Sequence, residues 1–112
     1  MKKVIKIGDK ELTVKATGAT PRLYRLEFKR DLFVDMQKLE SLDDDNPERF
    51  EILENVAYMM AKQGETSEGH DFPKDITEWL ESFDMLEFFE VLPDIFELWA
   101  DNNATTTEPK KK

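Results

Sequence analysis

The feature of this sequence that most constrains its fold is a strongly apolar segment from Pro47 to about Lys62. It follows Asp43-Asp44-Asp45-Asn46, a run of residue types that cap helix N-termini, and Pro47 suits the first helical turn. At about 100° per residue, its apolar side chains cover an arc of roughly 200°. A helix that is apolar over half of its circumference has to be covered on several sides, so the segment predicts the central helix of an α-helical domain. These apolar residues are Phe50, Ile52, Leu53, Val56, Ala57, Met59, Met60 and Ala61.

Length and composition limit the number of domains and the kinds of site. With 112 residues and a mass of 13.2 kDa, the chain suits one domain. Hydrophobic residues make up 39% of it, which is enough for a core although 37% of the residues are charged. The absence of cysteine excludes disulfides and thiolate metal sites and fits a reducing compartment such as the cytosol. No stretch approaches a secretion signal or the roughly 18 apolar residues of a membrane-spanning helix, so no membrane partner is expected.

Charge is distributed unevenly along the chain. The net charge is −9 and the pI is near 4.6, which argues against a generic binder of nucleic acid or anionic membranes. Residues 1–42 contain ten Lys and Arg against six Asp and Glu, whereas residues 43–102 contain three against eighteen. These opposite charges suit head-to-tail self-association into a homo-oligomer, or they are satisfied within one monomer.

The N-terminal segment predicts a β-hairpin over residues 3–16. Lys3–Ile7 and Glu11–Ala16 alternate apolar and polar residues with the period of two that half-buried strands show. Gly8-Asp9-Lys10 between them is typical of a tight turn, because glycine tolerates a positive φ and Asp bonds to its own backbone.

Helix signals follow along the rest of the chain. Thr20-Pro21 starts a helix whose apolar spacing continues to Leu42, Gln63–Lys74 has the composition of a loop, and Asp75 and Asp84 are N-caps for two further helices. Pro93 is expected to kink or restart the last of these. We therefore expect a mainly α fold: a single domain over residues 1–102 with about four to five helices and the N-terminal hairpin, and a flexible, disordered tail at 103–112.

The strongest enzymatic pattern is Glu51-x-x-Glu54 followed by Glu81-x-x-Asp84. Two such carboxylate pairs on neighbouring helices hold magnesium in all-α nucleotide pyrophosphohydrolases. A segment this acidic also produces the spacing by chance, so solvated helix faces are the favoured interpretation. The only histidine, His70, lies in a loop and no serine has a nucleophile context. We expect no catalytic, metal-binding or cofactor-binding residues and no enzyme activity, with the pyrophosphohydrolase kept as an alternative.

An acidic DNA mimic is the second alternative. Regularly spaced carboxylates on helices imitate phosphates, and residues 78–101 are acidic enough for this role. The same segment is also rich in aromatic side chains, which mimicry does not require. This aromatic set exceeds the needs of a domain this small, and large apolar patches usually meet another chain. The candidate partner-binding residues are Trp79, Phe83, Phe88, Phe89, Phe96 and Trp99.

Over most of its length the chain resembles the tail assembly chaperones of long-tailed phages and prophages of Gram-positive bacteria. The resemblance covers the hairpin, a helix entry, the acidic break at Pro47, the central apolar helix and two C-terminal motifs. The helix entry is Ala16-Thr17-Gly18-Ala19-Thr20-Pro21-Arg22-x-Tyr24-Arg25, continuing as Phe28-x-Arg30-Asp31-Leu32, and the C-terminal motifs are Ile76-x-x-Trp79-Leu80-x-x-Phe83 and Leu92-Pro93-x-Ile95-x-x-Leu98-Trp99.

The resemblance implies a non-enzymatic assembly factor without a cofactor. Such a factor coats the long, aggregation-prone tape measure protein and recruits tail tube subunits in the cytoplasm of the host cell. The residues are compatible with this role, because helices rich in aromatic and methionine side chains provide apolar surfaces that accept many sequences. The expected partners are therefore the tape measure protein and the tail tube protein.

Overall fold

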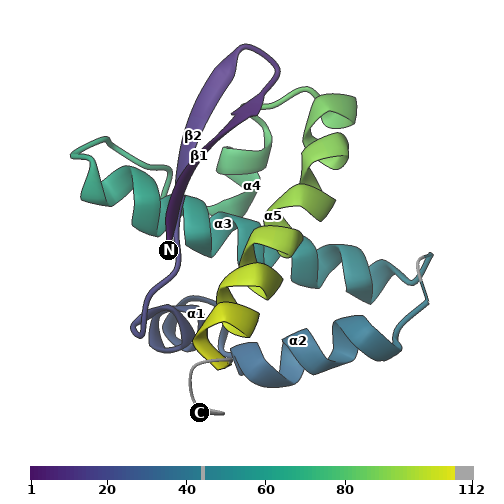
Figure 1. Cartoon of the computed structure of the whole chain (residues 1–112). Coiled ribbons are helices and arrows are strands. Elements are labelled where there is room, and N and C mark those ends of the chain that lie inside the picture. The colour runs from purple at the N-terminus through teal and green to yellow at the C-terminus, as the bar shows by residue number, and fades with distance from the viewer. Residues whose placement is uncertain (44, 108–112) are drawn as a thin grey trace.

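The computed structural model describes residues 1–43 and 45–107, and side chains as far as Glu97. Within these residues it contains a two-stranded sheet and five helices, so the prediction of a mainly α fold with an N-terminal hairpin is confirmed (Figure 1). The elements are β1 (Lys2–Ile7), β2 (Lys10–Lys15), α1 (Thr20–Phe28), α2 (Leu32–Ser41), α3 (Pro47–Ser67), α4 (Ile76–Leu80) and α5 (Met85–Thr107).

The hairpin forms as the alternation predicts. β1 and β2 pair antiparallel, with Ile5 opposite Leu12 and Ile7 opposite Lys10. Gly8 supplies the positive φ of 61° in a two-residue loop, the position at which a type II′ turn requires glycine. Ile7, Leu12 and Val14 on one face are buried, so this face of the hairpin joins the core.

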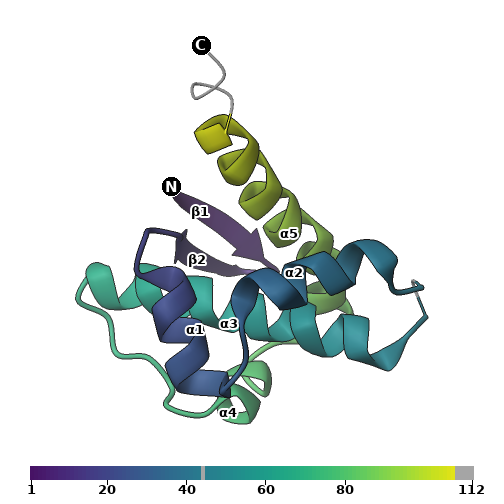
Figure 2. The ribbon, with the colours of Figure 1, turned by 90° about the horizontal axis from the view of Figure 1, so that it is seen from below.

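Helix α3 is central, as its wide apolar arc predicts. α1 and α2 cover one side of it, the hairpin stands on the opposite side and α5 crosses it (Figures 1 and 2). Ten of its residues are buried, from Ile52 through Gly64. The asparagine before Pro47 caps it, because the Asn46 side chain accepts a hydrogen bond from the Glu48 N–H at 2.8 Å.

The end of α3 differs from the prediction. We expected a loop from Gln63, but the helix continues to Ser67 through Gly64. Gly64 is buried there against β2: a Cβ at this position would lie 2.1 Å from the carbonyl oxygen of Thr13. At the next residue of the helix, the carboxylate of Glu65 accepts a hydrogen bond from the Thr13 N–H at 2.7 Å. The glycine therefore marks a close approach of helix and strand rather than a loop.

The prediction of one helix from Thr20 to Leu42 is wrong, since two helices, α1 and α2, occupy this range. Lys29 ends α1 in the left-handed conformation with φ 59°, and its N–H donates to the Arg25 carbonyl. Asp31 then starts α2, because its side chain accepts the Val34 N–H at 3.0 Å. The continuous apolar spacing concealed this break.

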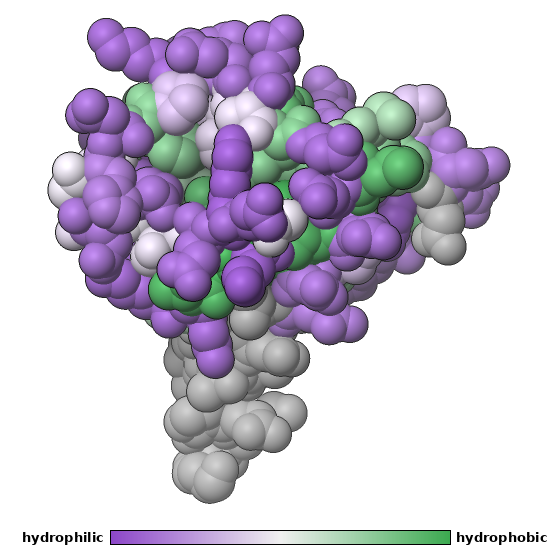
Figure 3. Space-filling model, turned by 90° about the horizontal axis from the view of Figure 1, so that it is seen from above, coloured by the Kyte–Doolittle hydropathy of each residue, from purple (hydrophilic) through white to green (hydrophobic). Residues whose placement is uncertain are grey.

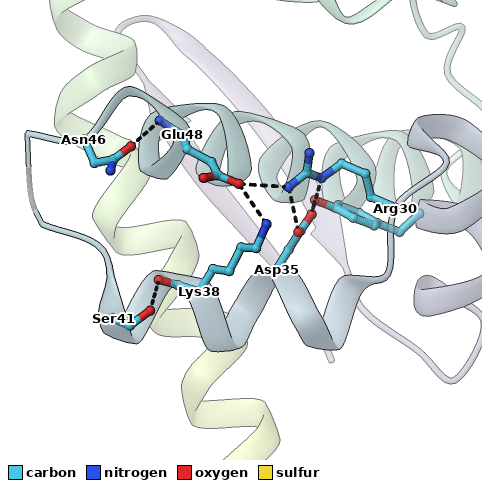
Figure 4. A network of polar contacts seen from close by, with 7 residues as sticks. Arg30, Asp35, Lys38, Ser41, Asn46 and Glu48 are labelled. Carbon is cyan, nitrogen blue, oxygen red and sulfur yellow. Dashed lines mark hydrogen bonds and ion pairs between the residues drawn. The ribbon is translucent and has the colours of Figure 1, made fainter.

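A polar network holds α1, α2 and α3 together at the break (Figure 4). Asp35 is buried and accepts hydrogen bonds from Tyr24 Oη at 2.7 Å and from Arg30 Nε at 2.8 Å. Arg30 Nη2 and Lys38 Nζ reach the Glu48 carboxylate at 3.3 and 3.0 Å. Burial alone would raise the pKa of Asp35, but the hydrogen bonds from Arg30 and Tyr24 hold it below its ordinary value.

The last two helices begin as predicted. The side chain of Asp75 accepts the Glu78 N–H, and that of Asp84 accepts the N–H groups of Leu86 and Glu87. Pro93 lies inside α5, and the helix does not restart there. α5 continues to Thr107 and so includes the first five residues of the predicted tail, 103–107; neither glycine nor proline interrupts the chain between Pro93 and Pro109. The remaining tail, 108–112, lies outside the described residues.

Candidate partner-binding surface

A groove between α3 and α5 lies in the region where the sequence predicts partner binding. Its volume is about 450 Å³. It forms because the first turns of α3 extend past the part of the helix that packs on α5, leaving side chains of both helices uncovered. The lining residues are Arg49, Phe50 and Leu53 from α3 and Pro93, Phe96 and Glu97 from α5.

Apolar side chains continue from this groove along α5 toward its N-terminus. The rings of Phe50 and Phe89 face each other across the two helices, with centroids 6.1 Å apart, and each side chain is 42% exposed. Met85 and Leu86, in the first turn of α5, are still more exposed, at 66% and 67%. Met85, Phe89 and Phe96 lie on one side of the helix, since they are four and seven residues apart. We call the groove and these flanking residues the α3–α5 surface.

This surface arises from the width of the apolar arc on α5. One part of the arc, with Phe88, Leu92 and Ile95, is buried in the core. The neighbouring part, with Met85 and Phe89, faces solvent because α3 covers only one side of α5. Contiguous apolar patches on a protein surface mark interaction sites when they are large and have a polar rim.

Two exposed acidic residues of α5 lie at the α3–α5 surface. Glu97 lines the groove, and Glu90 lies three residues, or about one helical turn, after Glu87 and nearer to this side of the helix. Glu87 itself lies against the hairpin turn at Gly8. From α3, Arg49 donates a hydrogen bond to the Leu39 carbonyl at 2.6 Å, which anchors the base of the groove to α2. The surface therefore combines an apolar floor with a charged rim, as protein interfaces do.

The six predicted aromatic residues do not form one surface. Trp79 and Phe88 are only 2% and 4% exposed and belong to the core. Trp79 packs edge-on against Tyr58 and Phe83, with ring centroids 5.6 and 5.2 Å away, and Phe83 is half-buried. Phe89 and Phe96 are the two that lie at the α3–α5 surface. The side chain of Trp99 lies outside those that the structure describes.

Phe50 belongs to the apolar arc of the central helix and is not among the predicted partner-binding residues, yet it is 42% exposed and lines the groove. Phe50 is at the edge of the apolar arc of α3, one turn before the segment that the hairpin and α5 cover. This position at the edge of the arc is the one feature of the sequence that could have indicated that Phe50 is exposed. Met85 and Leu86 are not among the predicted partner-binding residues, although both are largely exposed.

A second apolar groove of similar size, about 430 Å³, lies between α1 and α3. Leu23 and Leu26 line one wall and Met59 the other, and Leu26 is largely exposed. The Lys62–Glu27 ion pair, 3.1 Å long, joins the two helices at this groove. Figure 3 shows another face of the molecule, where hydrophobic areas lie between mostly hydrophilic side chains.

The carboxylate pairs expected under the pyrophosphohydrolase alternative are not gathered into a metal site. In the described part of the chain, no three His, Asp or Glu side chains are placed to hold one ion. Burial and, to a lesser extent, the charge of Glu51 raise the pKa of Glu54, so these two are neighbours on α3. Asp84 is engaged as the N-cap of α5, and His70 pairs with Glu65 at 2.8 Å on the surface.

Comparison with known proteins gives no relative: no protein family model, no curated protein and no solved structure matches this chain. Among the described residues, no helix has both the length and the apolar character needed to cross a membrane.

Proposed function

We propose that this protein is a phage tail assembly chaperone that binds and solubilises the tape measure protein in the cytoplasm of the host cell. The observation that carries the proposal is the α3–α5 surface: an apolar groove of about 450 Å³ continued by exposed Phe89 and Met85, on a protein with a net charge of −9. The sequence resemblance to tail assembly chaperones supplies the identity of the client.

The chemistry of the surface suits an amphipathic helical client. Such a helix lays its apolar side into a groove through residues spaced three and four apart, and Phe50, Phe89 and Phe96 provide broad, rigid contact area. Met85 adds a flexible side chain that adapts to different sequences. The exposed acids of α5 keep the complex charged and soluble while the apolar side chains of the client are covered.

The proposal also includes recruitment of tail tube subunits and self-association along the client. The groove between α1 and α3 supports this part, because it gives the protein a second open apolar surface on other helices than α5. The magnesium-dependent pyrophosphohydrolase and the DNA mimic lack a comparable feature among the described residues, so neither is proposed here.

Co-expression with the tape measure protein of the same genome tests the proposal. We expect the wild-type chain to make the client soluble and to co-purify with it. Phe50→Asp and Phe89→Asp each place a charge in the apolar surface at exposed positions, so we expect both variants to fold and to lose the client by at least about tenfold.

Phe33→Asp is the matched control, because Phe33 is an exposed phenylalanine on α2 that does not line the groove. It should retain the client at the wild-type level. A client that stays insoluble with the wild-type chain, or a loss of binding equal in all three variants, would contradict the proposal. Circular dichroism of each purified variant establishes that it is folded.

A further inference from the structure

The outer edge of β1 has unpaired backbone groups. Met1 and Ala16 exchange both backbone hydrogen bonds, at 3.0 and 2.9 Å, and hydrogen-bonded and non-hydrogen-bonded pairs alternate along an antiparallel ladder. With Val4 opposite Thr13, three residues later, Val4 therefore directs its N–H and C=O away from β2. Lys2 and Lys6 do the same. Thr13 confirms this geometry, since its N–H donates to Glu65 and not to Val4.

The two edges of the hairpin differ in whether another element covers them. α3 closes the β2 edge, where Glu65 accepts the Thr13 N–H and Gly64 lies against the Thr13 carbonyl. At the β1 edge, no backbone hydrogen bond of Lys2, Val4 or Lys6 occurs within the part of the chain that the structure describes. Val4 is 61% exposed, and both lysines are exposed beside it. Unpaired edge groups of this kind can pair with another strand, whereas lysines along the edge disfavour a strand that is not acidic.

The charge of the hairpin indicates which kind of strand can bind at the β1 edge. Five lysines and two acidic residues lie between Lys2 and Lys15, and Lys3, Lys6 and Lys15 form no ion pair among the described residues. A second copy pairing its β1 antiparallel about Val4 would place Lys2 opposite Lys6, and like charges directly opposite are destabilising. The last five residues of this chain contain three lysines and are repelled in the same way.

We propose that the outer edge of β1 binds an extended, acidic segment of another protein as a third strand. The backbone of that segment pairs with Lys2, Val4 and Lys6, and an apolar side chain covers Val4. Its carboxylates lie beside Lys3 and Lys6, since Lys2 already forms an ion pair with Glu68. The site is separate from the α3–α5 surface and does not depend on the client proposed for it.

The test is a titration of the isotope-labelled full chain, followed by NMR, with a synthetic peptide whose central segment is Glu-Glu-Val-Glu-Glu, so that Val can cover Val4 while Glu residues lie opposite the neighbouring lysines. The control peptide has Lys in place of each Glu. We expect the amides of Lys2, Val4 and Lys6 to shift and to gain protection from solvent exchange with the acidic peptide alone. Absence of these changes at millimolar peptide, equal binding of the lysine peptide, or changes centred on another element would overturn the proposal.

Val4→Pro removes the central outward N–H without touching the ladder to β2, because proline is tolerated where an edge N–H faces solvent. It should weaken binding of the acidic peptide by about tenfold, the effect of one lost hydrogen bond. The Lys3→Glu, Lys6→Glu double variant keeps the edge and reverses its charge at exposed positions, so it provides a second test that does not depend on how proline affects the hairpin. It should lose the acidic peptide and bind the lysine peptide; unchanged preference would overturn the proposal.

Discussion

Gly64 sets how closely α3 approaches the hairpin. A Cβ at this position would meet the backbone of β2 at Thr13 and Val14, at 2.1 to 2.8 Å, and backbone atoms have no rotamer to escape into. The glycine costs helix stability in isolation, since alanine is better by about 1 kcal/mol in a helix interior. Close packing therefore outweighs helix propensity at this residue.

Gly64→Ala should destabilise the protein by about 2 kcal/mol, because α3 and β2 have to move apart to admit the methyl group. Urea unfolding followed by circular dichroism measures the change. Gly18→Ala is the control, since a Cβ at Gly18 meets nothing within 4 Å, and it should change stability little. An alanine at 64 that leaves stability unchanged or raises it would show that α3 and β2 are not in this contact.

Asp35 carries the charge on which the joint between α1 and α2 depends. Replacing it with alanine leaves Tyr24 Oη and the Arg30 guanidinium without their buried acceptor, so Asp35→Ala should cost about 3 kcal/mol at pH 7. The pKa of Asp35 is lowered in the fold, so its contribution to stability is complete above its unfolded value of 3.8 and is lost as the pH falls below that value.

The stability difference between wild type and Asp35→Ala should therefore be largest near neutral pH and should narrow below about pH 4. Urea unfolding at pH 7, 5 and 3 measures it. A difference that is constant with pH, or that widens on acidification, would show that the ionised carboxylate is not the stabilising form.

At the level of the elements, local capping signals predicted most helix starts correctly. Asp75 and Asp84 cap their helices, and Pro47 follows its cap Asn46, because the chemistry of a helix start lies within four residues of sequence. The break between α1 and α2 is also local, because Lys29 takes the left-handed conformation and Asp31 caps α2, but an aspartate inside an apolar helical pattern is a weak signal by itself. The apolar spacing continues through the break, so periodicity alone could not reveal it.

The start of α2 gives a prediction at this scale. Asp31→Ala removes the acceptor for the Val34 N–H and should destabilise the protein by about 1 kcal/mol. Asp31→Asn keeps a capping oxygen and should stay close to wild type. Thermal unfolding of the two variants measures this difference. Equal stability of the alanine and asparagine variants would contradict a capping role for Asp31.

For the whole molecule, the sequence predicted six partner-binding aromatic residues, of which Phe89 and Phe96 lie at the α3–α5 surface while Trp79 and Phe88 are buried in the core. Phe88 and Phe89 are adjacent in sequence, yet one is in the core and the other is exposed, because their directions differ by about 100° around α5. Which of them is covered depends on where α3 lies. Phe50 joins the surface from a segment some forty residues away, which only the folded chain reveals.

The central claim is that the tape measure protein lies on the α3–α5 surface. The most direct measurement is photo-crosslinking in the co-expressed complex, with a photoreactive phenylalanine analogue at position 50, 89 or 33. Cross-links to the tape measure protein from positions 50 and 89, and none from position 33, are the predicted result. Cross-links from position 33 with none from 50 or 89 would place the client elsewhere on the molecule and contradict the claim.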